Sequence, residues 1–202
     1  PGEVLPPAYV VVNPNQGTCS SGLSYLCGAG VAFYLLRALK RYFFDHPSLP
    51  KYDFDLKEVL DFYTIATLTD MVPLIDDNRV LVKHGLAKLA ETKRPGLRSL
   101  LKELDLENRS LTSQDVAIRF APKLNALSRM ESGILPIDLF LVEDKGQATQ
   151  MVKQVIKNNS TRGQLQSDAE GEALEILKSW PHKDFVFVCS EKFHRGVVGL
   201  IA

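Results

Sequence analysis

The chain has 202 residues, with 24 Lys and Arg residues balanced by 24 Asp and Glu residues, and 45% of its residues are hydrophobic. This composition supplies enough apolar side chains to fill a globular core and excludes a protein that is disordered throughout. Because the formal charge sums to zero, no overall basic field indicates nucleic acid, and any contact with nucleic acid must be made by local groups. The sequence has no apolar run approaching the roughly 18–20 residues of a membrane span, and its start lacks a signal-peptide pattern.

Three cysteines, Cys19, Cys27 and Cys189, give an odd number and lack the paired spacing of a zinc site. We expect buried free thiols rather than disulfides or metal ligands, which is typical of a reducing compartment such as the cytoplasm. The sequence therefore predicts a cytoplasmic globular protein of one domain or one and a half.

The first predicted element is a short strand at Ala8–Val12, whose β-branched residues end at Asn13-Pro14. A turn-rich loop then leads to a helix at 28–44 with apolar residues around most of its surface, which indicates burial between layers. Further helices are predicted at 56–68, 78–90, 97–104 and 114–120. The hydroxyl of Thr112 or Ser113 is expected to cap the last of these by accepting a hydrogen bond from a first-turn amide.

A long helix is predicted at Gly146–Trp180, ended by Pro181, and a second strand at Asp184–Ser190. A helix of this length between two strand-bearing parts indicates a connector between domains. We therefore expect an α/β protein with a mainly parallel sheet covered by helices, then the connector, then the start of a second α/β domain. Ligands of such proteins bind at the carboxyl ends of the strands and in clefts between domains.

A single carboxylate, Asp70, stands at the end of an apolar segment that includes Ile65 and Leu68. Pro73 disfavours helical geometry at Val72, so the chain is expected to turn just beyond the acid. We expect the backbone that carries Asp70 to be buried and firmly held. A buried carboxylate is costly unless it is hydrogen-bonded, paired or bound to a metal, so these residues leave open a structural cap and a metal ligand.

The sequence Gly28-Ala-Gly30 has the start of a dinucleotide-binding loop, but Phe33 occupies the position of the third glycine. No acidic residue follows a second strand, as that loop requires. Close packing of the helix near an active site is the better interpretation of the two glycines.

Three basic residues, Arg119, Lys123 and Arg129, lie close together in the sequence around Pro122 and Asn125. They form either a solvated basic face or a contact to phosphate. In the second case Arg129 would bind phosphate with both prongs of its guanidinium group, assisted by Asn125.

His194 precedes Arg195 and Gly196, shortly after the second predicted strand. Glycines at a strand-to-helix turn let backbone amides approach an anion, and the N-terminus of the helix favours negative charge. His194 is therefore either a satisfied polar group or a phosphate contact, with Arg195 at the rim of the same site. The remaining histidines are expected at the surface: His46, His84 and His182.

Four parts of this sequence carry a resemblance to a known family. They are residues 5–15 and 28–35, residues 67–74 and 78–82, residues 120–130, and residues 194–202. The third reads Phe-Ala-Pro-Lys-Leu-Asn-Ala-Leu-Ser-Arg-Met, and the fourth reads His-Arg-Gly-Val-Val-Gly-Leu-Ile-Ala. In this order they resemble the RecJ single-stranded-DNA exonucleases of the DHH phosphoesterase superfamily. The resemblance covers essentially the whole chain, although Ser128 stands where the family usually has glycine.

The resemblance implies that residues 1–143 are the C-terminal part of a DHH-type catalytic domain, with its parallel sheet covered by helices. Residues 144–181 would be the connector helix, and residues 182–202 the start of a second, DHHA1-type domain. It further implies hydrolysis of phosphodiester bonds with two Mn²⁺ or Mg²⁺ ions, for which Asp70 is a metal ligand and catalytic carboxylate. The implied contacts to DNA phosphates are Asn125, Arg129, His194, Arg195 and Gly196.

In this family the other metal ligands come from an Asp-x-Asp motif, a further Asp and the Asp-His-His motif, which would precede residues 6–14. The chain is therefore expected to be an internal fragment that is inactive alone. Its parent would be a monomeric 5′-to-3′ exonuclease of DNA repair and recombination that binds single-stranded DNA and no membrane. A single-stranded-DNA-binding protein or a helicase would be its candidate protein partner.

Two alternatives stay open. The parent could be a smaller DHH-type enzyme that degrades short oligonucleotides or dephosphorylates a nucleotide. It could also be a catalytically silent relative that acts as a scaffold in replication or repair.

Overall fold

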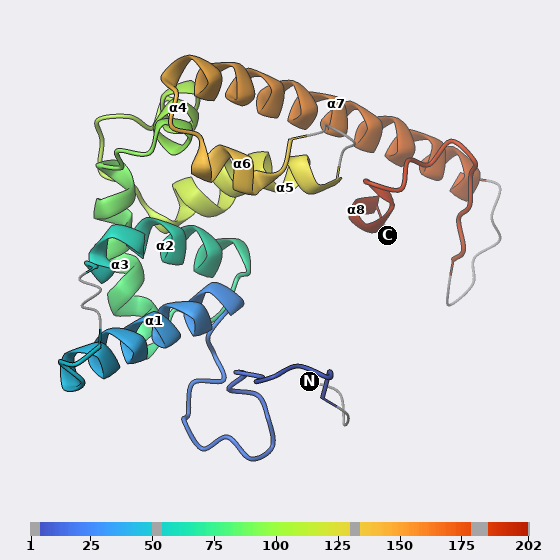
Figure 1. Cartoon of the computed structure of the whole chain (residues 1–202). Coiled ribbons are helices and arrows are strands. Elements are labelled where there is room, and N and C mark those ends of the chain that lie inside the picture. The colour runs from blue at the N-terminus through green and yellow to red at the C-terminus, as the bar shows by residue number, and fades with distance from the viewer. Residues whose placement is uncertain (1–4, 50–53, 130–133, 179–185, 202) are drawn as a thin grey trace. The chain divides into compact units, whose positions relative to one another are not determined.

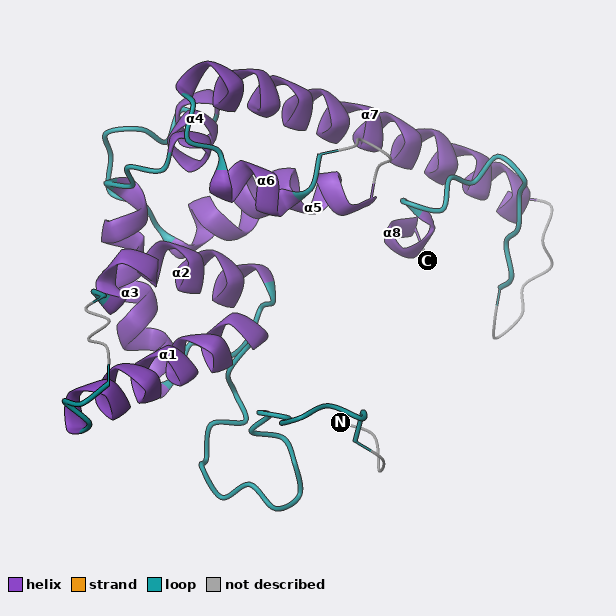
Figure 2. Cartoon of the chain, viewed as in Figure 1, coloured by secondary structure: helices purple, strands orange, loops and turns teal. Residues whose placement is uncertain are grey.

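The computed structural model describes residues 5–49, 54–129, 134–178 and 186–201, and these form helices and loops without a strand (Figure 2). The chain divides into two compact units, Pro1–Thr92 with Leu106–Ala121 and Lys93–Asp105 with Pro122–Ala202. No helix in the described ranges is long and apolar enough to cross a bilayer. The domain boundaries expected at 143/144 and 181/182 stay a prediction.

The first unit is built around one short, buried helix (Figure 1). It contains α1 (Gly28–Asp45), the 3₁₀ turn η1 (Leu56–Val59), α2 (Leu60–Thr69), α3 (Asp76–Ala90) and the π-helical turn η2 (Asp115–Phe120). The central element is α2, which packs against all four of the others. Most residues of α2 are buried because apolar and small polar side chains surround the helix on every side.

The two helices α2 and α3 approach closely because of one glycine. A Cβ atom at Gly85 would lie 1.9 Å from Thr64 Oγ1 and 2.6 Å from the carbonyl oxygen of Leu60. Only a residue without a side chain fits at this crossing. The sequence analysis did not single out Gly85, since an isolated glycine within a helical pattern does not reveal what lies opposite it.

A polar network joins α2 and α3 to the segment that precedes α1. Tyr63 donates to Asn78 Oδ1 at 2.6 Å, and the Asn78 amide donates to the carbonyl oxygens of Tyr25 and Pro73 at 3.1 and 2.9 Å. The ring of Phe33 meets the ring of Tyr63 edge to face at 5.2 Å. Every polar end of the buried Asn78 side chain is thus bonded, which fixes the turn between α2 and α3.

The cap predicted before residues 114–120 is confirmed. Thr112 Oγ1 accepts from the amide of Asp115 at 3.1 Å, and Asp115 Oδ2 accepts in return from the Thr112 amide and hydroxyl at 3.0 and 2.7 Å. This reciprocal pair is a capping box. Arg109 and Arg119 approach the other carboxylate oxygen of Asp115 at 3.0 and 3.6 Å.

The second unit is arranged along one long helix. It contains α4 (Pro95–Glu103), nearly all of α5 (Ala121–Arg129), α6 (Pro136–Leu141), α7 (Lys145–Lys178) and the single turn α8 (Val198–Ile201). Helices α4, α6 and α8 all pack against α7. A Cβ atom at Gly96 would lie 1.9 Å from the carbonyl oxygen of Leu139, so α4 and α6 also meet through a glycine.

The predicted helices are confirmed in place and differ mainly at their ends. The segment expected at 56–68 divides into η1 and α2, and the long helix expected at 146–180 runs from Lys145 to Lys178. Two helices, α5 and α6, were not predicted. Pro136 lies in the first turn of α6, where proline is tolerated because the first amides of a helix have no partner within it. Helix α5 continues η2 without a break, so Pro122 follows the π-helical turn.

The predicted strands are not formed in the described part of the chain. Residues 8–12 are irregular, and the Tyr9 and Val10 side chains are exposed. Residues 184 and 185 lie outside the described residues, while 186–190 form an irregular segment. A β-branched run indicates a strand only where a neighbouring strand can pair with its backbone, and no described segment does so. The expected parallel sheet is therefore not confirmed.

Candidate functional site

The first predicted site residue, Asp70, is placed at the end of the buried helix α2. Its amide donates to the carbonyl oxygen of Ala66 at 2.9 Å, and its backbone has φ −77° and ψ −6°. The next residue, Met71, has a left-handed φ of 54°, and this reverses the chain before Pro73. The helix is thus followed by a residue in the left-handed conformation, a position that is usually occupied by glycine.

The Asp70 side chain is exposed, which corrects the expectation that this acid is held within a buried segment. The burial of α2 reaches Leu68 and stops there. Among the described residues, nothing hydrogen-bonds or pairs with the Asp70 carboxylate, so its structural-cap interpretation gains no support. The carboxylate is presented on a firmly packed helix and is open to a ligand.

The described residues contain no group of three or more His, Cys, Asp or Glu side chains that could hold a metal ion. A two-metal site requires several oxygen or nitrogen ligands around each ion. Asp70 alone therefore does not fit such a site, and it could supply only one of its ligands.

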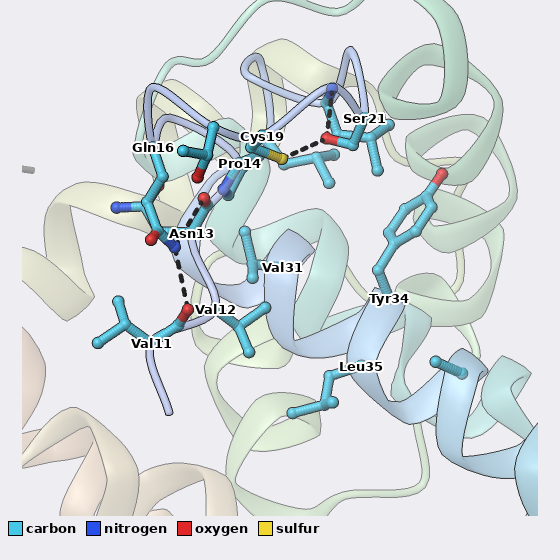
Figure 3. Close-up of a pocket in the computed structure, with 14 residues that line it drawn as sticks. Val11, Val12, Asn13, Pro14, Gln16, Cys19, Ser21, Val31, Tyr34 and Leu35 are labelled. Carbon is cyan, nitrogen blue, oxygen red and sulfur yellow. Dashed lines mark hydrogen bonds between the residues drawn. The ribbon is translucent and has the colours of Figure 1, made fainter. Parts of the chain in front are cut away.

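The first unit also has a cavity of about 400 Å³ between the N-terminal loop and α1. Figure 3 shows Val11 and Val12 of the loop and Val31 and Leu35 of α1 around it. Most of its lining is apolar, and hydrogen bonding to the side chain and then the backbone of Ser21 lowers the pKa of Cys19 at its rim. No charged side chain lines the cavity, so it lacks the positive charge of a phosphate site.

The glycines at the start of α1 do not form an anion-binding loop. Cys27 caps the helix, and its sulfur accepts from the Gly30 amide at 3.4 Å and lies 3.8 Å from Thr67 Oγ1. A Cβ atom at Gly28 would meet nothing within 4 Å, and one at Gly30 would meet only Leu26 and Cys27. The expected close packing of another helix at these glycines is therefore wrong, and the close approach lies at Gly85 instead.

The cysteines are free, as predicted, but only Cys27 is buried, whereas Cys19 and Cys189 are exposed. The surface positions expected for His46 and His84 are confirmed. His182 lies outside the described residues.

The three basic residues Arg119, Lys123 and Arg129 belong to two different units of the structure. Arg119 belongs to the first unit and pairs with Asp115 at 3.6 Å. Lys123 and Asn125 lie on α5 in the second unit, both half-buried. The backbone of Arg129 ends α5, and its side chain lies outside the described residues. The stretch is helical through Arg129, the end of α5.

His194 lies in a tight turn before α8. Its Nδ1 accepts from the Gly196 amide at 3.0 Å, so a neutral ring carries its proton on Nε2. In that tautomer the Nε2–H is the remaining hydrogen-bond donor of the ring. The Gly196 residue is buried and its amide is bonded to the histidine, while Arg195 is exposed beside it. The phosphate contacts expected at these residues stay a prediction.

The predicted site residues therefore fall into two groups. Asp70 belongs to the first unit, and Asn125, Arg129, His194, Arg195 and Gly196 belong to the second. The sequence interpretation missed a third group on α7, in which Asn158, Asn159 and Arg162 carry buried polar atoms without partners. The signal was present as a polar interruption in the buried face of that helix.

Comparison with known proteins finds relatives that match the whole chain. The single-stranded-DNA-specific exonuclease RecJ of Salmonella typhimurium is 30% identical over 211 residues, an alignment that covers all of this chain. The crystal structure of RecJ from Thermus thermophilus with Mn²⁺ matches all of it with a TM-score of 0.80 at 30% identity. The chain belongs to the RecJ family. No protein-family model matches it.

The same RecJ was also solved with Mg²⁺, and that structure matches 94% of the chain with a TM-score of 0.73 at 29% identity. The RecJ-type similarity extends over only part of these relatives. This chain spans 37% of the Salmonella protein and 29% of the manganese-bound Thermus chain.

Proposed function

We propose that the protein carrying this chain is a metal-dependent exonuclease that digests single-stranded DNA from its 5′ end. The observation that carries this proposal is the similarity to RecJ over the full chain, at 30% identity in sequence and a TM-score of 0.80 in structure. It extends from the N-terminal loop through α7 to α8, which favours this activity over that of a smaller DHH-type phosphodiesterase.

Asp70 is proposed to supply one ligand to a divalent metal ion. Its carboxylate is exposed and has no described partner, and its backbone is held between a buried helix and a left-handed residue. A bulky residue in that conformation carries strain of about 1–2 kcal/mol, and such strain is often found at functional sites. Mn²⁺ and Mg²⁺ prefer oxygen ligands of this kind, and both ions are bound in structures of the Thermus relative.

The described residues do not complete a metal site, so we propose that the remaining ligands belong to other parts of a longer protein. Two-metal hydrolysis is accordingly a proposal for that protein, and the 202-residue chain alone should be inactive. Release of nucleotides from 5′-ended single-stranded DNA by this chain with Mn²⁺ tests the point. Turnover that survives Asp70→Ala would contradict both the fragment's inactivity and the ligand role.

The second unit is proposed to hold the DNA backbone. The support is the His194 ring, whose orientation is fixed by the bond from the Gly196 amide to its Nδ1, together with the basic residues around α5. In this proposal Asn125, Arg129, His194 and Arg195 contact phosphates, and Gly196 shapes the turn that positions the histidine.

Three variants of the intact protein separate the two roles. Asp70→Asn should abolish turnover and leave single-stranded-DNA affinity unchanged or slightly tighter, because a negative charge near the phosphates is removed. Arg129→Ala should weaken binding to all sequences alike and reduce the salt dependence by about one phosphate contact. His194→Ala should also weaken binding, with a smaller change in salt dependence than Arg129→Ala if the histidine is neutral.

The measurement is affinity against salt concentration, beside turnover, with Asp105→Asn as the control for loss of an exposed carboxylate in the same chain. If Asp70→Asn abolished binding while Arg129→Ala left affinity and slope untouched, the two roles would be reversed. Binding without turnover in the unaltered protein would instead identify a silent scaffold.

A further inference from the structure

The buried face of α7 is apolar in its first half and then becomes polar. Positions spaced alternately by four and three residues share one face, as in any helix that packs along its length. At the start of α7 they are the buried Ala148, Val152 and Val155. The same face then continues with Asn159 and Arg162. It becomes apolar again at Ala169.

The polar interruption carries atoms that are buried without a partner. Asn158 is only 8% exposed, and its Nδ2 has no hydrogen-bond partner among the described residues, although its Oδ1 accepts from Gln154 at 2.7 Å. Asn159 Oδ1 and Arg162 Nε are likewise buried and unpartnered. Residues three and four apart are neighbours on a helix, so these groups lie around one spot. Buried polar groups are almost always bonded, so their state points to a missing partner.

A second positive charge belongs to the same unit. Lys123 lies half-buried on α5, and the charge of Arg162 acts on it. Burial lowers the pKa of Lys123, and the positive charge of Arg162 lowers it further. No described acidic residue pairs with Lys123 or Arg162. Two like charges held together in this way create a local potential that favours an anion.

We propose that Lys123, Asn158, Asn159 and Arg162 form a binding site for a phosphate group of the nucleic-acid backbone. Arg162 Nε–H and Asn158 Nδ2–H are donors, and Lys123 supplies a second charge. The Asn159 amide presents its NH₂ group when turned about its last bond, since its oxygen and nitrogen are interchangeable in shape. A guanidinium group and amide donors match the spread of oxygens on phosphate.

This proposal deepens the proposed nuclease function and rests on it, because it adds residues of α7 to the surface that holds DNA. It differs from the contacts proposed at Arg129 and His194, which lie at the end of α5 and before α8. It also gives the long helix a role in binding as well as in connecting.

The test measures affinity of the 202-residue chain for a fluorescently labelled thymidine oligonucleotide, by anisotropy, at several salt concentrations. Arg162→Leu should weaken binding about tenfold and lower the slope of log affinity against log salt by about 0.7, the value for one phosphate of a single strand. Lys123→Gln should act in the same direction. Lys157→Gln removes an exposed charge from the same helix and should change affinity less than about twofold.

A second arm distinguishes backbone phosphate from free phosphate. At constant ionic strength, inorganic phosphate should raise the melting temperature of the unaltered chain more than chloride does, and Arg162→Leu should remove the difference. Phosphate stabilisation without any effect of Arg162→Leu on oligonucleotide affinity would overturn the nucleic-acid assignment. Equal behaviour of Arg162→Leu and Lys157→Gln in both arms would overturn the site itself, as would absence of both binding and stabilisation in the unaltered chain.

If Arg162→Leu fails to fold, as seen by circular dichroism, the half-buried Lys123→Gln carries the same comparison. Failure of the α7 site is therefore seen in binding by the Arg162 and Lys123 variants, whereas failure of the proposed nuclease function is seen in turnover by the Asp70 variant.

Discussion

Two buried asparagines, Asn78 in the first unit and Asn158 in the second, show how the same side chain serves different purposes. Asn78 is fully buried and bonded at both ends, to Tyr63 and to two backbone carbonyls. Asn158 is nearly as buried, but its amide nitrogen has no partner among the described residues. A polar group whose bonds are complete holds the fold, whereas one whose bonds are incomplete has capacity left for a ligand.

Absence of a partner does not by itself mark a binding site. Thr64 Oγ1 is also buried without a partner, but α3 packs directly against it at Gly85. No ligand could reach that oxygen. The groups on α7 differ because several of them share one spot and carry a positive charge.

The largest expected effect tests the tight packing of the first unit. Gly85→Ala should lower the free energy of unfolding by about 3 kcal/mol, because the new Cβ atom would overlap Thr64 Oγ1 and the Leu60 carbonyl. Gly163→Ala on α7 is the control, since a Cβ atom there meets nothing within 4 Å. It should raise stability by about 0.5–1 kcal/mol. Urea unfolding measures both, and equal effects would contradict the close approach of α2 and α3.

The next effect compares the two asparagines directly. Asn78→Leu should cost about 2–3 kcal/mol, since it leaves the Tyr63 hydroxyl and two carbonyls without a partner. Asn158→Leu should be close to neutral, because it removes a buried donor that has no partner and takes an acceptor only from the half-buried Gln154. A similar loss from both substitutions, measured by urea unfolding, would show that Asn158 is structural as well.

A smaller effect concerns pH. Hydrogen bonds from the Thr112 side chain and backbone, followed by the charges of Arg109 and Arg119, lower the pKa of Asp115. Because the folded pKa is lower than the unfolded one of about 3.9, the carboxylate stabilises the fold above that pH. This contribution is lost as the pH falls through the folded pKa. Asp115→Asn should therefore be less stable than the unaltered chain at pH 6, and the gap should narrow at pH 3.

The control for this pH dependence is Asp105→Asn, since Asp105 is an exposed acid of the same chain. Its stability relative to the unaltered chain should change little between the two pH values. A constant gap for Asp115→Asn across this range would show that the capping box contributes through shape rather than charge.

The smallest effect tests the strained turn after Asp70. Met71→Gly should raise stability by about 1 kcal/mol, since glycine adopts the left-handed conformation without strain and the Met71 side chain is exposed. A loss of stability in thermal unfolding would show that the methionine side chain supports the turn.

The sequence predicted the helices well because their apolar spacing is set locally, as in α1, α3 and α7. It also predicted the cap at Thr112, whose signal lies within four residues. It predicted strands wrongly at 8–12, because pairing depends on a neighbouring strand that a local pattern does not reveal. The close approach at Gly85 was missed for a similar reason, since it depends on which residue of α2 lies opposite.

The residues of the candidate sites were likewise predicted only in part. Asp70 was found from its place after an apolar run and from resemblance to a family, but its exposure could not be read from that run, which suggested burial. Arg162 and its asparagines were missed because the long helix was judged by its overall polarity. Sorting its residues by face would have revealed two asparagines and an arginine within an apolar stripe.

The central claim is that incomplete bonding on α7 marks a place for phosphate, in contrast to the completed network beneath α1. A crystal structure of this chain with a short thymidine oligonucleotide tests it most directly. The account predicts a phosphate oxygen about 2.7–2.9 Å from Arg162 Nε, with the Asn158 amide also donating to it and the Asn78 network unchanged. Bound DNA that leaves Arg162 Nε and Asn158 Nδ2 without a phosphate contact would contradict it.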